Sequence, residues 1–243
     1  MEHLEGRQSI VAALRARQRR FEVILMRHGL HADAMQEVVE LAQSANVPIR
    51  QVEGRELDAM AHGASHGGIL AICSAKPRTT PRELLELIDQ SRAAPLLLLL
   101  EGIDDARNLG FTMRSAEALG ATAVLIKKHL WDFDAVEVAR PSSGAYERLP
   151  LVQIDDLEPL QQLQRRGIRL IGCLAGVRTS MYACDLKLPT IIAIGGEKRG
   201  LSGAVRSICD GFITIPSIEG SASLSLSAAA AVVLAEAMRQ RAK

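Results

Sequence analysis

Two apolar runs near the end of the chain, Ile191–Ile194 and Phe212–Ile215, have the length and composition of buried strands. The first stops at Gly195-Gly196 and the second at a proline, and a polar loop rich in Gly, Ser and Glu follows each. Because glycine has no Cβ, the backbone there can approach a ligand closely. The second loop leads into Leu224–Met238, which is predicted to be a buried helix capped by serines. Two such loops side by side would form a pocket of backbone groups, as is typical of sites for an adenosine-bearing cofactor.

The stretch before these loops shows the same alternation of strands and helices. The leucine run at 96–100 predicts a fully buried parallel strand that opens the second domain. The pattern then predicts a helix from about Leu109 to Leu119, strands at Ala123–Ile126 and Leu170–Cys173, and a further helix or turn opened by Pro141–Ala145. In an open α/β sheet, ligands gather at the carboxyl ends of the strands. Leu174 follows one such end, so it either borders the site or is an ordinary core leucine.

The first 75 residues alternate in the same way and predict a compact α/β unit. The expected elements are a helix at Gly6–Arg19, a strand at Phe21–Met26, a helix at Ala34–Ala45, and strands at Val47–Val52 and Ile69–Cys73. Prolines at 77, 81 and 95 bracket a short, charged helical stretch. We therefore expect a first domain at 1–75, a linker at 76–95 and a second domain at 96–243.

Composition narrows the class of protein. The chain has 243 residues, 48% of them hydrophobic, and a net charge of +1, which allows large cores and local basic patches but no polycation. The four cysteines show no CxxC spacing and the histidines no metal-binding constellation, so we expect reduced thiols and no metal. No apolar run approaches the roughly 20 residues that span a bilayer, so a cytoplasmic protein without a membrane partner is expected. Fingerprints of dinucleotide folds, phosphate loops and serine hydrolases are absent.

Three ordered motifs then point to a family. NLGFTMRSA at 108–116, GGEKRGL at 195–201 and IPSIEGSASLSLS at 215–227 resemble the three motifs of the SpoU/TrmH branch of the SPOUT methyltransferases. This resemblance implies a C-terminal domain with a parallel sheet and a deep trefoil knot, a homodimer, S-adenosylmethionine as cofactor and RNA as substrate.

The amino-terminal unit carries a second resemblance. GRQSIVAAL at 6–14 and SHGGILAI at 65–72 are similar to the ribosomal-protein-like RNA-binding domain of one family subgroup. Gly67 departs from that subgroup, where the segment usually reads His-Gln-Gly. Arg7 and His66 would contact RNA; the alternative is a solvated arginine and a histidine that caps a strand.

The resemblance also assigns roles to individual residues. It implies that Arg114 handles the ribose proton, and that Asn108 and Ser223 orient Arg114 or the ribose. Glu197 lies in a loop of otherwise flexible residues, so we expect it to fix that loop by hydrogen bonding; the alternative is that it takes a proton. Since a guanidinium in water holds its proton very strongly, Arg114 is a poor base without help, and the alternative role is to position the phosphate and stabilise the developing alkoxide. Without the motifs, Asn108 and Arg114 would be a helix cap and a surface residue. The residues implied for the cofactor are Leu174, Gly195, Gly196, Ile215 and Leu224.

One departure bears on activity. The third motif usually reads Ser-Leu-Asn-Val-Ser, whereas this chain has Ser225 in place of the asparagine. The expected function is methylation of a ribose 2′-hydroxyl, on a guanosine of large-subunit ribosomal RNA as in the subgroup. The alternatives are methylation of transfer RNA and a non-catalytic RNA-binding relative. Ser225 favours the non-catalytic alternative, while intact Asn108, Arg114 and Glu197 oppose it.

Overall fold

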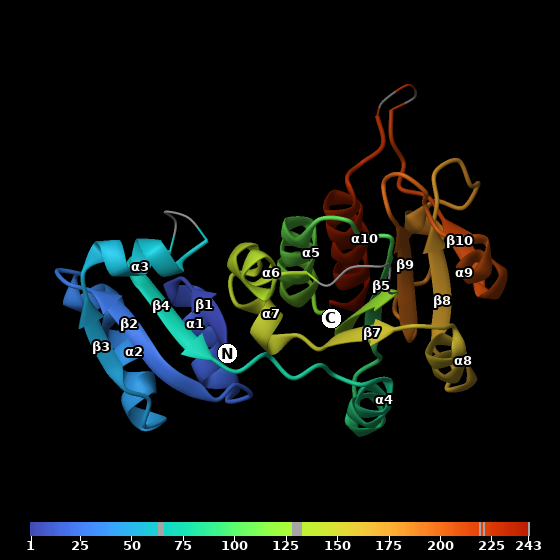
Figure 1. Ribbon diagram of the computed structural model, residues 1–243. Helices are drawn as coiled ribbons and strands as arrows, with labels where there is room; N and C mark the ends of the chain where they lie inside the picture. The colour runs from blue at the N-terminus through green and yellow to red at the C-terminus, as the bar shows by residue number, and fades with distance from the viewer. Residues whose placement is uncertain (63–65, 128–132, 219, 221, 243) are drawn as a thin grey trace. The chain divides into compact units, whose positions relative to one another are not determined.

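The computed structural model describes residues 1–62, 66–127, 133–218, 220 and 222–242, so Ser65, Glu219 and Ser221 of the quoted motifs lie outside the described residues. The chain forms two units (Figure 1). Unit 1 comprises residues 1–77 together with 133–148, and unit 2 comprises 78–132 and 149–243. The segment 133–148 therefore packs with the amino-terminal residues, although it lies between two strands of unit 2 in the sequence.

Unit 1 is built on a four-stranded mixed sheet in the order β1-β4-β2-β3. Its strands are β1 (Glu2–Glu5), β2 (Phe21–Arg27), β3 (Ile49–Val52) and β4 (Ile69–Cys73), and its first helices are α1 (Arg7–Ala16), α2 (Ala32–Ser44) and α3 (Gly54–Met60). Only β2 and β3 run parallel to each other. The five elements predicted for this region are confirmed, with ends shifted by a few residues, while β1 and α3 were not predicted.

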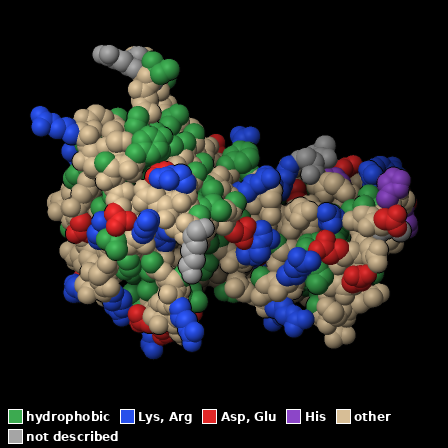
Figure 2. Space-filling model, turned by 180° about the vertical axis from the view of Figure 1, so that it is seen from behind, with side chains coloured by type: hydrophobic (Ala, Val, Ile, Leu, Met, Phe, Trp, Pro, Cys, Tyr) green, Lys and Arg blue, Asp and Glu red, His purple; other side chains and the backbone are tan. Residues whose placement is uncertain are grey.

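The period of two along β2 explains how this sheet is covered on both faces. Ile24 and Met26 belong to the core that includes α1 and α2, whereas Leu25 packs with Leu57 of α3 on the other face. Figure 2 shows that the surface of this unit carries Lys, Arg and His side chains interspersed with acidic ones. The apolar positions thus form the two cores, and most charged side chains of unit 1, of both signs, lie at the surface.

The segment 133–148 adds two short helices to unit 1, α6 (Ala135–Ser142) and α7 (Ala145–Arg148). Pro141 lies in the last turn of α6, so it ends one helix, and the predicted turn and a short helix, α7, follow it. Gly144 adopts φ +88°, and a Cβ there would lie 2.6 Å from the Cβ of Ala12 on α1. Glycine at this position therefore allows the turn between α6 and α7 to touch α1.

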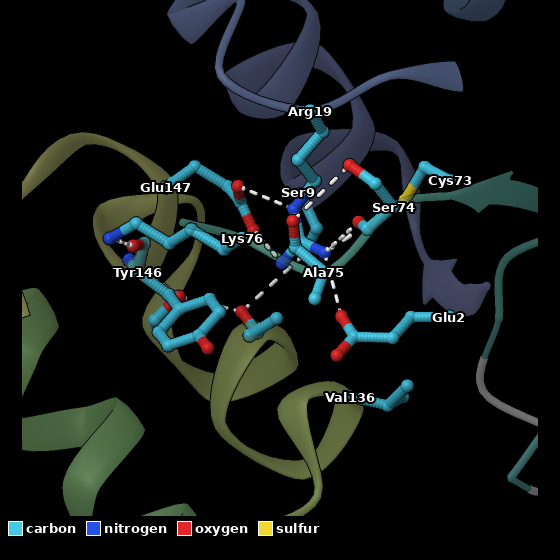
Figure 3. A network of polar contacts seen from close by, with 12 residues as sticks. Glu2, Ser9, Arg19, Cys73, Ser74, Ala75, Lys76, Val136, Tyr146 and Glu147 are labelled. Atoms are coloured by element: carbon cyan, nitrogen blue, oxygen red, sulfur yellow. Dashed lines mark hydrogen bonds and ion pairs between the residues drawn. The ribbon is translucent and has the colours of Figure 1, made fainter. Parts of the chain in front are cut away.

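A buried ion pair joins this segment to the amino-terminal part of unit 1 (Figure 3). Arg19 forms two hydrogen bonds to Glu147, Nε to Oε2 at 2.9 Å and Nη2 to Oε1 at 2.8 Å. Its Nη1 also donates to Glu2 and to the Ser74 carbonyl. The side chains of Arg19 and Glu147 are 1% and 0% exposed. Burial alone would lower the pKa of Arg19, but the hydrogen bonds and charge of Glu147, aided by Glu2, raise it. The positive charge of Arg19 and the negative charge of Glu147 thus stabilise each other in the interior of unit 1.

We expect Glu147→Gln to lower the free energy of unfolding by about 3 kcal/mol, because it removes the buried counter-charge of Arg19. Glu86→Gln is the control: Glu86 pairs with Arg82 on an exposed helix face, so its loss should cost less than about 0.5 kcal/mol. Urea denaturation followed by circular dichroism measures both. Equal, small effects of the two variants would contradict the role of the Arg19–Glu147 pair.

Unit 2 is an all-parallel six-stranded sheet in the order β10-β8-β9-β5-β6-β7. Its strands are β5 (Leu96–Glu101), β6 (Ala123–Lys127), β7 (Leu151–Ile154), β8 (Arg169–Cys173), β9 (Thr190–Gly195) and β10 (Gly211–Ile213). Its helices are α4 (Pro81–Gln90), α5 (Ala106–Ala118), α8 (Glu158–Arg165), α9 (Gly203–Ile208) and α10 (Leu226–Arg241), with a 3₁₀ turn, η1, at Met181–Ala183. This confirms the predicted α/β class and parallel sheet.

Strand β5 lies inside the sheet and is buried along its whole length, as predicted. Leu97 and Leu99 belong to a core with residues of α4, α8 and α9. The alternate leucines, Leu96 and Leu98, are equally buried and point to the opposite face by the period of two. Helices α5 and α10 pack against each other, and α10 also contacts β9 (Figure 1). A strand covered on both faces explains an uninterrupted leucine run.

The end of α10 is tied to the backbone of unit 2. The guanidinium of Arg241 donates to the carbonyl oxygens of Ala94, Pro95, Leu186 and Leu188. A cation at a helix C-terminus that satisfies several carbonyls fixes the position of the last turn. Among the described residues, no helix is long and apolar enough to cross a membrane.

Candidate functional site

The candidate site lies at the carboxyl ends of β8, β9 and β10, three neighbouring strands. Ile194 pairs with Cys173, and Cys173 with Ile213, so the strands end at similar levels. Leu174, Gly195 and Ile215 therefore emerge at one edge of the sheet, where open parallel sheets bind ligands. Because β10 ends at Ile213 rather than at the predicted Ile215, Ile215 belongs to the loop and not to the strand.

The loop after β9, residues 195–202, is tightly folded. Gly200 N donates to the Gly196 carbonyl at 2.8 Å. A Cβ on Gly195 would lie 2.0 Å from the carbonyl carbon of Gly200, and one on Gly196 would lie 2.1 Å from the Gly102 carbonyl oxygen. Gly195 is thus required by backbone packing within the loop, and Gly196 by packing against the backbone at the end of β5. The sequence predicted that these glycines allow close approach of a ligand, and the structure shows that they also allow close approach of backbone segments to each other.

The first motif lies on α5, which begins three residues earlier than predicted. Asp105 is the N-cap, and its carboxylate accepts hydrogen bonds from the backbone N–H groups of Arg107 and Asn108. Asn108 therefore sits inside the first turn, not in a loop before the helix, and it is not the cap. Arg114 lies about 9 Å further along the helix axis. Arg114 is exposed, and among the described residues its side chain has no hydrogen bond or ion pair, which leaves it available to a ligand.

The third motif leads into α10, which begins at Leu226 rather than at the predicted Leu224. Ser225 is the N-cap: its Oγ accepts a hydrogen bond from Ala228 N at 3.3 Å. Serine and asparagine are similarly good N-caps, so the departure from the family pattern preserves the start of the helix. Leu224 and Ser223 precede it and are exposed.

Glu197 connects the second and third motifs. Its Oε1 accepts a hydrogen bond from Leu226 N, the first residue of α10, at 3.4 Å. A carboxylate at a helix N-terminus also interacts favourably with the helix dipole. The structure thus brings the Gly195 loop to the start of α10, and α5 beside α10. No hydrogen bond among the described residues joins Asn108 or Arg114 to that loop.

Two cysteines lie in or next to these strands, Cys173 in β8 and Cys209 between α9 and β10. Burial raises the pKa of Cys173, the last residue of β8, to about 11. Burial, with a smaller contribution from Asp210, also raises the pKa of Cys209 to about 11. Both groups are therefore neutral thiols near pH 7. Since the thiolate is the nucleophilic form, neither competes as a nucleophile for an electrophilic ligand.

The sequence analysis missed three residues that support the loop. Glu101 is the last residue of β5, Lys127 is the last residue of β6, and Ser202 is the N-cap of α9. Glu101 accepts hydrogen bonds from Lys127 Nζ at 2.9 Å and from Ser202 N at 2.7 Å. A single acid directly after five leucines at the end of a buried strand was the available signal, because a charge in such a place requires partners.

The candidate RNA contacts of unit 1 already have partners within the protein. His66 is buried, with Nε2 2.9 Å from Asp58 Oδ1, and its Nδ1 accepts a hydrogen bond from Gly68 N. Arg7 pairs with Glu37 at 3.0 Å. Gly67 has φ +63°, a conformation that suits glycine better than the glutamine usual in the subgroup. His66 therefore caps its turn, while Arg7, which is half-buried, keeps donors for other contacts.

A parallel sheet with glycine loops at its carboxyl edge, and three ordered motifs on those loops and on α5 and α10, define a methyltransferase-type fold with a separate α/β unit before it. The chain belongs to the SpoU rRNA methylase family, whose model matches residues 95–235. The RNA 2′-O ribose methyltransferase substrate-binding domain matches residues 3–79. Both resemblances drawn from the sequence are confirmed.

Individual relatives agree. The chain is 36% identical over 242 residues to the 23S rRNA (guanosine-2′-O-)-methyltransferase RlmB of Pseudomonas syringae pv. tomato, covering 99% of this chain and 96% of the relative. A crystal structure of an RNA 2′-O ribose methyltransferase superposes with a TM-score of 0.81 at 27% identity, over 98% of this chain and 88% of the other. The crystal structure of the SpoU methyltransferase AviRb from Streptomyces viridochromogenes, in complex with the cofactor AdoMet, superposes with a TM-score of 0.81. The identity is 25%, over 98% of this chain and 90% of that one.

We expect Gly195→Ala to weaken binding of S-adenosylmethionine at least tenfold, because the added Cβ overlaps the Gly200–Leu201 backbone and opens the loop. Gly203→Ala is the matched control: a Cβ there meets nothing within 4 Å, and alanine suits the first turn of α9. Isothermal titration calorimetry gives both dissociation constants. Unchanged affinity in Gly195→Ala would remove the cofactor from this loop.

Proposed function

We propose that this protein transfers a methyl group from S-adenosylmethionine to the 2′-hydroxyl of a guanosine ribose in large-subunit ribosomal RNA, in the cytoplasm. The observation that carries the proposal is its similarity, over the full length of both units, to a 23S rRNA guanosine methyltransferase. The matches of both family models support the same division of labour, with unit 1 for RNA and unit 2 for transfer.

The residues at the carboxyl edge fit the cofactor. Leu174 and Ile215 are half-buried apolar residues on neighbouring loops, and Gly195 and Gly196 leave backbone rather than side chains beside them. Such a lining suits an adenine ring held by apolar contact and backbone hydrogen bonds. Leu224 adds a fifth position at the entrance to α10. The bound cofactor would supply an activated methyl group, so the chain has only to orient the ribose and accept its proton.

Arg114 and Asn108 are the side chains we assign to the ribose. Both lack hydrogen-bonded side-chain partners among the described residues, unlike Glu197, whose carboxylate already holds the start of α10. The planar guanidinium of Arg114 would bind the RNA phosphate and stabilise the developing alkoxide. Asn108 and the exposed Ser223 hydroxyl would orient the ribose. Glu197 fixes the two loops relative to each other.

We expect Arg114→Ala to reduce methyl transfer by about 10²–10³-fold with nearly unchanged cofactor affinity, because it removes a transition-state contact. Arg114→Lys should recover little, since lysine lacks the planar fork. The assay measures tritium incorporation from labelled cofactor into ribosomal RNA, with nuclease mapping of the product. Robust transfer by Arg114→Ala would exclude the proposed role of the arginine.

Two alternatives predict different outcomes in that assay. A transfer RNA methyltransferase would label transfer RNA in preference to ribosomal RNA, and the match of the substrate-binding model to unit 1 argues against it. A non-catalytic RNA-binding relative would label neither, and restoring the usual residue by Ser225→Asn would not change that. The intact N-cap at Ser225 favours a working site.

The proposal includes a homodimer formed through α5 and α10 and the family's trefoil knot. Phe111 on α5 and Val232 and Met238 on α10 are large apolar residues that are 49%, 36% and 48% exposed. Large exposed apolar residues on two helices that pack together are compatible with an association surface. Support for the knot comes from family membership, since topology rules otherwise disfavour one; the anchoring of Arg241 is compatible with an enclosed chain end.

We expect Val232→Asp to convert the dimer into monomers, because it places a charge at an exposed apolar position of α10, the helix proposed for the interface. Leu87→Asp is the control, since Leu87 is similarly exposed, at 44%, but lies on α4. Size-exclusion chromatography with light scattering reports the mass of each variant. A parent protein that is monomeric at micromolar concentration would contradict the dimer.

A further inference from the structure

Glu101 is a buried carboxylate that lies outside the three motifs. It ends β5, its side chain is 9% exposed, and it pairs across the sheet with Gly195 on one side and Lys127 on the other. A buried charge is costly unless it is paired and hydrogen-bonded. Its partners therefore show what the carboxylate holds in place.

Glu101 binds both ends of the loop at 195–202. Its carbonyl oxygen accepts a hydrogen bond from Gly196 N at 2.6 Å, at the start of the loop. Its Oε2 accepts one from Ser202 N at 2.7 Å, at the end of the loop. One residue thus sets the separation between the two ends.

The second carboxylate oxygen fixes the orientation of the first. Oε1 accepts a hydrogen bond from Lys127 Nζ at 2.9 Å, and this lysine closes the neighbouring strand β6. Burial alone would raise the pKa of Glu101, but hydrogen bonds from Ser202 and Lys127 outweigh it and lower the pKa. The group is therefore a carboxylate at neutral pH, with one oxygen for each donor.

The loop between these anchors has little freedom of its own. Gly195 is packed against the Gly200–Leu201 backbone, so the loop closes only if its two ends stay at this separation. Ser202 also caps α9, since its Oγ accepts a hydrogen bond from Val205 N at 3.2 Å. Displacing Ser202 would therefore open the loop and disturb the first turn of α9.

We propose that Glu101 is a positioning residue for S-adenosylmethionine, which holds the loop at 195–202 in its binding shape before the cofactor arrives. The inference rests on the proposed function, because it takes this loop as part of the cofactor site. A preformed loop avoids an ordering cost on binding, so its loss appears in affinity for the cofactor. Glu101 itself lies beneath the loop and takes no part in transfer.

The test compares Glu101→Gln with the double variant Glu101→Gln/Lys127→Met. Lys127 Nζ and Ser202 N are both hydrogen-bond donors. Glutamine has one acceptor oxygen and one NH₂ group, so its NH₂ donor faces one of these two donors and cannot bond to it. With methionine at 127, the amide oxygen can accept from Ser202 N and the NH₂ no longer faces a cation. We expect Glu101→Gln to raise the cofactor's dissociation constant and KM at least tenfold, with kcat at saturating cofactor within about twofold. The double variant should recover most of the affinity.

A merely structural role gives a different pattern. It would lower the folded, active fraction, so kcat would fall while the KM for cofactor stayed unchanged, and that result would overturn the inference. Unchanged affinity in Glu101→Gln, with weakened binding in Gly195→Ala, would overturn the inference but leave the proposed site standing. Unchanged cofactor affinity in Glu101→Gln and in Gly195→Ala would overturn the inference and the proposed cofactor site together. Failure of the double variant to regain affinity would exclude the proposed competition between Lys127 and Ser202.

Discussion

The register between β5 and β9 determines the arrangement of the carboxyl edge in unit 2. Every residue of β5 from Leu96 to Leu100 is leucine, so burial of apolar surface hardly distinguishes one register from the next. A strand shifted by one residue would still bury leucines on both faces. Glu101 reduces this degeneracy, because a shift against β9 would move its buried carboxylate away from Ser202 N, and a shift against β6 would move it away from Lys127. A polar residue at the end of an apolar strand thus specifies a pairing that hydrophobicity leaves open.

Around that edge, the candidate residues form two groups: those whose side chains have hydrogen-bond partners within the protein, and those whose side chains have none among the described residues. Glu197 and Ser225 both have backbone N–H groups of α10 as partners, and their geometry stabilises the start of that helix. Asn108 and Arg114 lie on α5, and their side chains have no hydrogen bond or ion pair among the described residues. The site therefore combines a rigid, internally satisfied loop system with two uncommitted polar side chains, a combination that suits a reaction whose activated group arrives on the cofactor.

Much of the fold followed from periodicity. The leucine strand, the strand at Ile69–Cys73 and the helical stretch bracketed by prolines at 77, 81 and 95 were predictable, because apolar runs and proline positions are local signals. The start of α5 was placed too late, because the capping carboxylate of Asp105 was overlooked. Resemblance supplied the motif residues, but not Glu101, whose importance depends on donors from β6 and from the end of another loop. Sequence also gave no sign of the Arg19–Glu147 pair, since its partners are 128 positions apart.

That separation has a consequence for how the protein is made. Synthesis proceeds at roughly 5–20 residues per second, so Glu147 leaves the ribosome's catalytic centre roughly 6–25 seconds after Arg19. During that interval the amino-terminal strands and helices can collapse, yet the place of Arg19 in their core lacks its main counter-charge. Unit 1 therefore completes its interior only when α7 has been translated, after β5 and β6 of unit 2. The unit that is started first therefore cannot be finished until part of the second unit has been synthesised.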